Sequence, residues 1–288
     1  MELSSLNGAR DTSTSATETD KIVHPLTSIG SRAERAICFD LDGTLIDPYL
    51  GISRSVAFAL ERLGVAGADD MTFEAFIGPP IQDAFQRLLG PDVALATTAV
   101  RYFRERYGEI GLFEAVPYPE ISAVLAELSA EAPLFICTSK PKIYADRIAN
   151  AFGIDRYFAG IYGSELDGTR AKKSELLAWL VEREGLGRVA TAMVGDRSHD
   201  ISAARENGVT PYGVLWGYGS ERELVEAGAE RLFSTVRDLR ALSSIIAKVD
   251  RANDPDPGAS VAEARGAPKT NAAIDEKNGA SGVCVGWI

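Results

Sequence analysis

Two acidic residues follow the first apolar run of the sequence. The run begins at Ala36, and Asp40 and Asp42 come at its end, with Gly43 directly after them. Side chains alternate along an extended segment, so both carboxylates can point to the same side, and glycine permits the sharp turn that exposes them. Two carboxylates this close repel each other unless they share a proton or a cation lies between them. The same pattern also fits a turn that merely ends a strand, so it does not establish a catalytic site by itself.

A second pair of acids, Asp196 and Asp200, follows another apolar run, Met193–Gly195. The two are one helical turn apart, at the start of the helix expected after that run. Asp196 also suits the N-cap position of such a helix, which is the structural alternative. Beside the first pair, however, a further strand-end acid makes an oxygen cage of the kind that Mg²⁺ prefers, with few protein ligands and open positions for water and phosphate.

Hydroxyl groups follow a third apolar run, and basic groups lie at the start of a later helix. An apolar run ends at Thr138 and Ser139, where a hydroxyl and the free backbone N–H groups of the next helix could bind phosphate, although an ordinary Thr N-cap also fits. Lys172 and Lys173 lie at the start of a later helix. A cation there is unfavourable to the helix dipole, so we expect one of the two to face a phosphate and the other to be a solvated surface charge.

Short apolar runs alternate with segments of helical periodicity through the middle of the chain. Four runs indicate buried strands: Ala36–Leu41, Pro133–Thr138, Val189–Gly195 and Tyr212–Trp216. Three helical patterns lie between them, over Ile121–Leu128, Ile143–Phe152 and Leu176–Val181. Strands that alternate with helices require right-handed crossovers and a parallel sheet. The expected fold class is therefore α/β, with a Rossmann-like parallel sheet and helices on both of its faces.

The first two strands are separated by about ninety residues, too many for one crossover helix. This interval reads as several helices, so we expect an inserted α-helical cap over residues 49–115 and an α/β core made of residues 35–48 and 116–248. Ligands of open α/β sheets bind at the carboxyl ends of the strands, where such a cap would cover them. The polar, unpatterned ends, residues 1–34 and 249–288, are expected to be disordered tails.

Composition limits the partners of this chain. Its 288 residues carry a formal net charge of −11, which argues against a nucleic acid polymer or an anionic membrane, because both require clustered Lys and Arg. A small anionic substrate is not excluded, since a metal and a few local cations can invert the field of one pocket. Cys38, Cys137 and Cys284 show no metal-site or disulfide spacing. Without a long apolar run or a signal-peptide pattern, we expect a cytoplasmic protein with no membrane contact.

Taken together, these four groups of residues, each at the end of a strand or the start of a helix, resemble the four motifs of the haloacid dehalogenase-like (HAD) hydrolase superfamily. The resemblance covers roughly Ala36 to Ala241 and is specific in two motifs, Asp40-x-Asp42-Gly43-Thr44 and Gly195-Asp196-Arg197-x-x-Asp200. It implies that Asp40 is the nucleophile of a phosphoryl-transfer reaction. It also implies that Asp42 is the general acid and base.

The resemblance implies roles for the remaining candidates. Thr138, with Ser139 beside it, matches the hydroxyl that binds the transferring phosphoryl group. Lys173 matches the active-site lysine because Lys173–Leu176 has the family's register, with Lys172 as the alternative. The implied Mg²⁺ ligands are Asp40, Asp42 through its main-chain carbonyl, Asp196 and Asp200. The last of these would act through a water molecule, or would orient the lysine instead.

A helical insertion after the first motif is typical of the subgroup that contains phosphoglycolate phosphatases, β-phosphoglucomutases and dehalogenases. Gly78–Pro80, Gly163–Thr169 and Gly213–Ser220 are similar to its phosphoglycolate phosphatase and 5′-nucleotidase-like branch. The similarity implies Mg²⁺-dependent hydrolysis of a small phosphorylated metabolite through a phosphoaspartate, by a monomer or homodimer. Arg54, on the first cap helix, is a candidate to bind the leaving group, although a surface charge explains it as well.

Three alternatives use the same scaffold. Dehalogenases lack the second acid, so Asp42 argues against that reaction. A β-phosphoglucomutase-like phosphotransferase usually uses polar cap residues, and this cap contains no histidine. A catalytically silent phosphate-binding regulatory module would not need all four motifs intact. The Gly217-x-Gly219 pair does not make a dinucleotide site, because Arg222 stands where a third glycine is needed.

Overall fold

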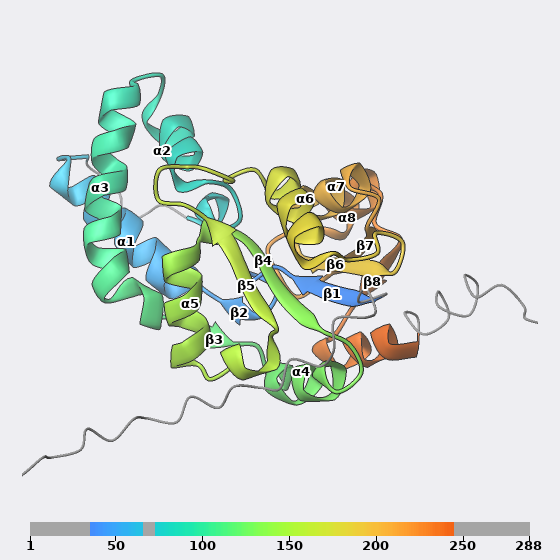
Figure 1. Ribbon diagram of the computed structural model, residues 1–288. Coiled ribbons are helices and arrows are strands. Elements are labelled where there is room, and N and C mark those ends of the chain that lie inside the picture. Colours follow the sequence, from blue (N-terminus) through green and yellow to red (C-terminus); the bar gives the residue numbers. More distant parts are fainter. Residues whose placement is uncertain (1–34, 66–72, 245–288) are drawn as a thin grey trace, which may run out of the picture.

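The centre of the core is a parallel β-sheet (Figure 1). The computed structural model describes residues 35–65 and 73–244, so the predicted tails, 1–34 and 249–288, lie outside the described residues. In this part of the chain the sheet has six strands in the order β5-β4-β1-β6-β7-β8. They are β1 (Ala36–Phe39), β4 (Leu134–Pro141), β5 (Gly160–Ser164), β6 (Thr191–Gly195), β7 (Thr210–Val214) and β8 (Arg231–Phe233).

Both faces of the sheet are covered by helices, as expected from the sequence. Ile37 and Phe39 of β1 belong to one buried cluster, whereas Ala36 and Cys38 belong to another, because successive side chains of a strand point to opposite faces. The first cluster contains apolar residues of α4 (Ile121–Ser129) and α5 (Lys142–Ala151). The second contains those of α6 (Lys173–Glu184) and α7 (Ser198–Glu206). The α/β fold class is confirmed.

A group of helices inserted after β1 forms the cap (Figure 1). Two short antiparallel strands, β2 (Ile46–Asp47) and β3 (Val116–Pro117), join it to the core on both sides. The cap consists of α1 (Tyr49–Arg62), η2 (Glu74–Phe76), α2 (Ile81–Leu89), α3 (Val93–Glu109) and η3 (Gly111–Phe113). Aromatic rings fill its interior: Phe85 lies edge-on to Phe76 and to Phe103, and Phe103 stacks on Tyr107.

Several elements differ from the sequence expectations. The edge strands β5 and β8 were not expected, and neither were β2 and β3. β4 continues to Pro141, past the expected end at Thr138, after a shift in its register with β5. The next helix, α5, therefore begins only at Lys142, so Thr138 is not its N-cap. The remaining elements are η4 (Asp155–Tyr157), α8 (Glu221–Ala227) and η5 (Val236–Arg240).

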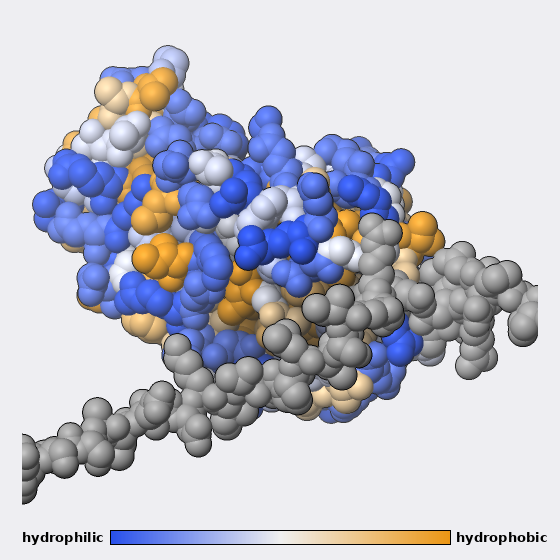
Figure 2. Space-filling model, viewed as in Figure 1, coloured by the Kyte–Doolittle hydropathy of each residue, from blue (hydrophilic) through white to orange (hydrophobic). Residues whose placement is uncertain are grey.

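One face of the molecule shows little apolar continuity (Figure 2). On the face in Figure 2 most residues are hydrophilic, and hydrophobic residues occur in small separate groups. None of the helices in the described part of the chain combines the length and the apolar character that a bilayer span requires. Cys38 and Cys137 are free and buried, as expected for small apolar residues in strands.

Candidate active site

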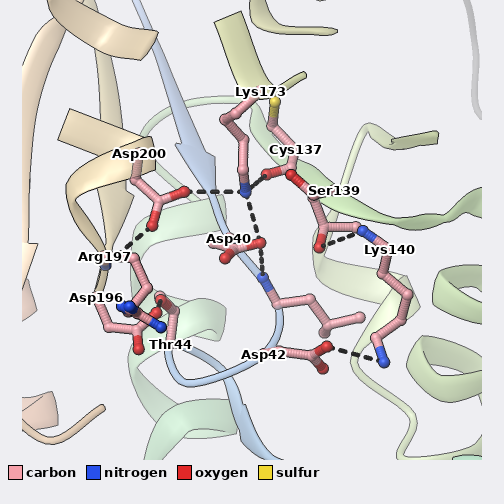
Figure 3. Close-up of polar contacts among 12 residues, drawn as sticks. Asp40, Asp42, Thr44, Cys137, Ser139, Lys140, Lys173, Asp196, Arg197 and Asp200 are labelled. Atoms are coloured by element: carbon pink, nitrogen blue, oxygen red, sulfur yellow. Dashed lines mark hydrogen bonds and ion pairs between the residues drawn. The ribbon is translucent and has the colours of Figure 1, made fainter. Parts of the chain in front are cut away.

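Asp40 lies at the carboxyl end of the central strand β1, directly after its last residue (Figure 3). Its Oδ1 accepts a hydrogen bond of 2.8 Å from the backbone N–H of Leu41. The chain then turns at Gly43, whose φ of +79° is a left-handed conformation that favours glycine. A Cβ atom at this position would also lie 2.2 Å from Asp196 Oδ2. The glycine thus allows the first acidic motif to approach the second.

Lys173 connects Asp40 with Asp200 (Figure 3). Its Nζ lies 2.8 Å from Asp40 Oδ1 and 2.9 Å from Asp200 Oδ1, and it donates a 3.0 Å hydrogen bond to the carbonyl of Cys137. Burial lowers the pKa of this lysine, but the two carboxylates outweigh that effect and raise it, so the ammonium stays charged. Lys172 points outward with 79% of its side chain exposed and pairs with Glu175. The structure therefore places Lys173, and not Lys172, in the site.

Asp196 follows β6 and is completely buried. Its Oδ1 accepts a hydrogen bond of 3.3 Å from the Thr44 hydroxyl, and its Oδ2 accepts one of 2.8 Å from the Tyr218 N–H. The N-cap of α7 is Arg197, so Asp196 does not have the capping role that was its structural alternative. Two glycines make room for it, because a Cβ at Gly217 would lie 2.3 Å from Asp196 Cβ, and one at Gly219 would lie 1.9 Å from its carbonyl oxygen.

Asp40, Asp196 and Asp200 form a cluster that fits a divalent cation. Each offers an oxygen within 4.8 Å of the others, and all three are buried. Burial and the neighbouring acids raise the pKa of Asp196 to about 8. Burial also raises the pKa of Asp200 to about 6, although Lys173 opposes the shift. Carboxylates that resist ionisation in this way are stabilised by a positive ion, and an all-oxygen donor set is the one Mg²⁺ prefers.

Asp42 faces a different lysine. Lys140 Nζ lies 2.8 Å from Asp42 Oδ2 (Figure 3) and also donates a hydrogen bond to the Tyr107 hydroxyl of the cap. Burial raises the pKa of Asp42, and Lys140 opposes that shift. Neither Lys140 nor Tyr107 was singled out from the sequence, where the lysine reads as a loop residue after Ser139 and the tyrosine as part of an apolar helix stripe.

Asp40 and Asp42 open into a cavity between the core and the cap. Thr138 and Ser139 line it from the core, and the Gly78–Pro80 turn lines it from the cap. The Thr138 hydroxyl also accepts a hydrogen bond of 3.4 Å from the Lys140 N–H. The cavity wall is mainly apolar and aromatic: Ile52, Phe76, Pro79, Pro80, Ile81, Phe103, Tyr107, Pro141 and Tyr144.

The expected cap residue Arg54 is not among the residues that line this cavity. Its Nη1 lies 2.7 Å from Glu114 Oε1, and 54% of its side chain is exposed. A different cap arginine, Arg104, lines the cavity instead. Arg104 also donates a 2.9 Å hydrogen bond to the carbonyl of Leu166 in the core. The structure thus brings together every predicted site residue except Arg54.

A family model described as haloacid dehalogenase-like hydrolase matches residues 37–214 of the chain. This match spans more than half of the sequence and includes both acidic motifs and the lysine of the site. The chain belongs to the haloacid dehalogenase-like hydrolases.

Curated relatives of this HAD hydrolase carry more than one name. A 5′-nucleotidase of Pseudomonas aeruginosa is 48% identical over 65% of this chain and 86% of its own length. The tyrosine-protein kinase PtkA of Mycobacterium tuberculosis is 34% identical over 64% of this chain, which spans only 62% of PtkA. A phosphoglycolate phosphatase of Neisseria meningitidis is 30% identical over 68% of this chain and 87% of its own length.

A solved structure supports the same assignment of the fold. A protein described as a predicted phosphatase from Clostridium acetobutylicum superimposes with a TM-score of 0.68 at 32% sequence identity. The match covers 75% of this HAD hydrolase and 99% of the other chain.

Proposed function

We propose that this HAD hydrolase is a Mg²⁺-dependent phosphatase that hydrolyses small phosphomonoesters through a phosphoaspartate on Asp40. The observation that carries the proposal is the position of Asp40. Its carboxylate lines the cavity, belongs to the acidic cluster and is paired with a buried lysine. A nucleophile at a strand end beside phosphate-binding groups and a cation site is the arrangement that phosphoryl transfer requires.

In the first step, Asp40 attacks the phosphorus atom. A bond forms between the carboxylate oxygen and phosphorus, and the bond from phosphorus to the leaving oxygen breaks. The hydrogen bond from the Leu41 N–H and the contact with Lys173 hold Asp40 in a single orientation for this attack. Lys173 and the Thr138 hydroxyl then stabilise the negative charge on the phosphoryl oxygens.

Asp42 serves both steps as acid and base. It gives its proton to the departing alkoxide, and it then takes a proton from the water that attacks the phosphoaspartate. Its buried position on the cavity wall agrees with this role. The second step releases phosphate and restores the Asp40 carboxylate.

The carboxylates of Asp40 and Asp196 and the main-chain carbonyl of Asp42 would hold the Mg²⁺ ion, which neutralises charge on the phosphoryl oxygens when bound. Asp200 lies 2.9 Å from Lys173 Nζ, which supports the second role considered for it, orientation of the lysine. Thr44 and Tyr218 fix Asp196 through hydrogen bonds to its two oxygens, and ligands held in this way bind a metal more tightly.

Nucleoside 5′-monophosphates are the substrate class we propose first, with phosphoglycolate as the alternative. The aromatic wall of the cavity favours a leaving group with a flat apolar surface. Among the described residues, the lining contains no histidine, asparagine, glutamine or glutamate. A phosphotransferase that holds a sugar through such groups is therefore disfavoured. The sequence-based expectation of a cytoplasmic monomer or homodimer stays a prediction.

Phosphate release from a panel of phosphomonoesters tests the proposal. The panel would contain nucleoside 5′-monophosphates, phosphoglycolate, sugar phosphates and p-nitrophenyl phosphate, each with Mg²⁺ and with EDTA. We expect Mg²⁺-dependent release from at least one of them, and loss of that release with EDTA. Absence of release from the whole panel would favour the silent regulatory module. Full activity in EDTA would exclude the proposed role of the metal.

A further inference from the structure

Each of the two catalytic carboxylates has a lysine of its own. Lys173 contacts Asp40, and Lys140 contacts Asp42, both at 2.8 Å (Figure 3). The mechanism uses Lys173 to stabilise the phosphoryl oxygens, but it assigns nothing to Lys140. Yet 94% of the Lys140 side chain is removed from solvent. A lysine is seldom buried to this extent unless its ammonium has specific partners.

The partners of Lys140 come from both parts of the molecule. On the core side its Nζ contacts only one oxygen of Asp42, Oδ2. On the cap side it donates to the Tyr107 hydroxyl, and the same nitrogen lies 4.6 Å from the centre of the Tyr107 ring. Lys140 therefore bridges the core and the cap, with one partner on each side.

The other oxygen of Asp42 is differently placed. Oδ1 is buried and has no hydrogen-bond partner among the described residues. Asp42 itself lines the cavity that receives the substrate. Because an ammonium group only donates hydrogen bonds, and the carbonyl oxygen of a protonated carboxyl is its better acceptor, the contact of Lys140 with Oδ2 favours the acidic proton on Oδ1. The proton of a protonated Asp42 is thereby directed to Oδ1.

Tyr107 is held firmly in the cap. Its ring stacks on Phe103 with centroids 4.9 Å apart and meets the edge of Tyr144 at 5.7 Å. Only 3% of the residue is exposed. The position of the Lys140 ammonium is consequently set by Tyr107 of the cap as well as by Asp42 of the core. The orientation of Asp42 therefore depends on the cap being in place.

We propose that Lys140, held by Tyr107, is a positioning residue for Asp42, which it orients so that Oδ1 presents the proton to the leaving oxygen when the cap covers the site. This inference rests on the proposed phosphatase function. In the step concerned, the bond from phosphorus to the leaving oxygen breaks while the proton of Asp42 moves to that oxygen. Lys140 itself neither gains nor loses a proton.

Substrates that differ in their need for that proton test the proposal. Benzyl phosphate releases a strongly basic alkoxide, whereas 2,4-dinitrophenyl phosphate releases a stable phenolate that needs no protonation. Both leaving groups have one aromatic ring and suit the same cavity. The quantity compared is kcat/KM, because it reports the steps up to departure of the leaving group and not the later hydrolysis of the phosphoaspartate.

We expect Lys140→Met to lower kcat/KM for benzyl phosphate about 100-fold and that for 2,4-dinitrophenyl phosphate less than about 5-fold, since general acid catalysis contributes roughly 10²–10⁴-fold. Tyr107→Phe keeps the ring packing and removes only the hydroxyl. It should lower the benzyl phosphate value about 3- to 10-fold, with the other value unchanged within about 2-fold. Asp42→Asn supplies the reference for a selective loss, and Lys142→Met, an exposed lysine two residues away, should change neither value.

Equal losses on both substrates would overturn the proposal and show that Lys140 acts on the transferring phosphoryl group or on the fold. No loss on either would also overturn it. Thermal unfolding of each variant identifies a defect of the fold, and Tyr107→Phe keeps the test decisive if Lys140→Met does not fold. If the unaltered protein released phosphate from neither substrate, the proposed function would fail, which differs from an equal loss in the variants.

Discussion

The core side and the cap side of the cavity present different groups to a substrate. The core contributes most of the charged residues of the site, among them Asp40, Lys173 and Asp196, each fixed by at least two polar contacts. The cap contributes mainly aromatic and aliphatic surface. Chemistry at the phosphorus atom is thus built into the α/β core, and the cap offers apolar contact to whatever is attached to the phosphate.

The two sides also differ in how they are held together. The core is joined by the ladder hydrogen bonds of its sheet, whereas separate side-chain hydrogen bonds join the cap to it, among them those from Lys140 to Tyr107 and from Arg147 to the carbonyl of Gly108. Arg197 of the core, next to Asp196, donates a 2.8 Å hydrogen bond to the carbonyl of Ile77 in the cap. Arg104 of the cap donates one to the carbonyl of Leu166 in the core. Glu223 Oε1 lies 3.1 Å from Arg197 Nε and so fixes the arginine side chain. We therefore expect substitutions in the core to change kcat and those in the cap to change KM, except at Tyr107, which acts on Asp42 through Lys140.

Asp40→Asn should show the largest effect. The amide keeps the shape of the side chain but is a poor nucleophile, so we expect kcat to fall by at least about 10⁴-fold. Circular dichroism would show that the variant is folded, since the substitution removes one of several mutually repelling acids. Activity within tenfold of the unaltered protein would show that Asp40 is not the nucleophile.

Asp196→Asn should come next. The loss of one carboxylate weakens the cation site, so we expect kcat/KM to fall about 10²- to 10³-fold, with half-maximal activity moved to a higher Mg²⁺ concentration. Initial rates measured over a Mg²⁺ titration provide both numbers. An unchanged Mg²⁺ dependence would be incompatible with a role for Asp196 in holding the ion.

Lys173→Met and Lys172→Met form a matched pair on adjacent residues. Removing Lys173 leaves Asp40 and Asp200 buried without their cation, so we expect about 3–5 kcal/mol less stability and about a 100-fold lower kcat. Lys172 is exposed, and its substitution should change the free energy of unfolding by no more than about 0.5 kcal/mol. Urea unfolding together with initial rates measures both. The reverse order would make Lys172 the active-site lysine.

Arg104→Met tests the contribution of the cap to substrate binding. It removes the hydrogen bond to Leu166 and a cation from the cavity wall, so KM should rise about 3- to 10-fold while kcat stays within about 2-fold. Arg101→Met is the control, because Arg101 lies on the exposed face of the same helix. A fall in kcat with KM unchanged would show that Arg104 takes part in the chemistry, contrary to the division described above.

Arg54→Ala should have the smallest effect. The pair with Glu114 is largely exposed on the arginine side, and such pairs contribute about 0.2–1 kcal/mol. We expect KM to change less than about 2-fold. A tenfold increase in KM would instead support the role at the leaving group that the sequence suggested.

The fold could be predicted where the sequence is strongly patterned. The central strands appeared as uninterrupted apolar runs because both of their faces are buried. β5 did not, since glycines interrupt Gly160–Ser164 and its first two residues are only partly buried. β8 has only three residues, one of them exposed. Short edge strands carry too little periodicity to be distinguished from loops.

The site was predictable to the extent that its residues follow strand ends. Asp40 and Asp196 do so directly, Lys173 opens a helix, and Thr138 lies near the end of β4. The link between Lys140 and Tyr107 could not be predicted, because it joins residues from the core and the cap that are distant in the sequence. The role of Gly217 and Gly219 could not be predicted either: these positions require glycine because they lie against Asp196, and not because they bind a dinucleotide.

The most direct test of the central claim is to trap the covalent intermediate. The protein would be mixed with a good substrate and Mg²⁺, quenched in acid within the first turnover, digested and analysed by mass spectrometry. Borohydride reduction of a parallel sample converts an aspartyl phosphate to homoserine and marks its position. The account predicts one added phosphoryl group, and one homoserine, at Asp40. Modification at Asp42 or Asp196, or rapid turnover with no modified peptide at all, would contradict it.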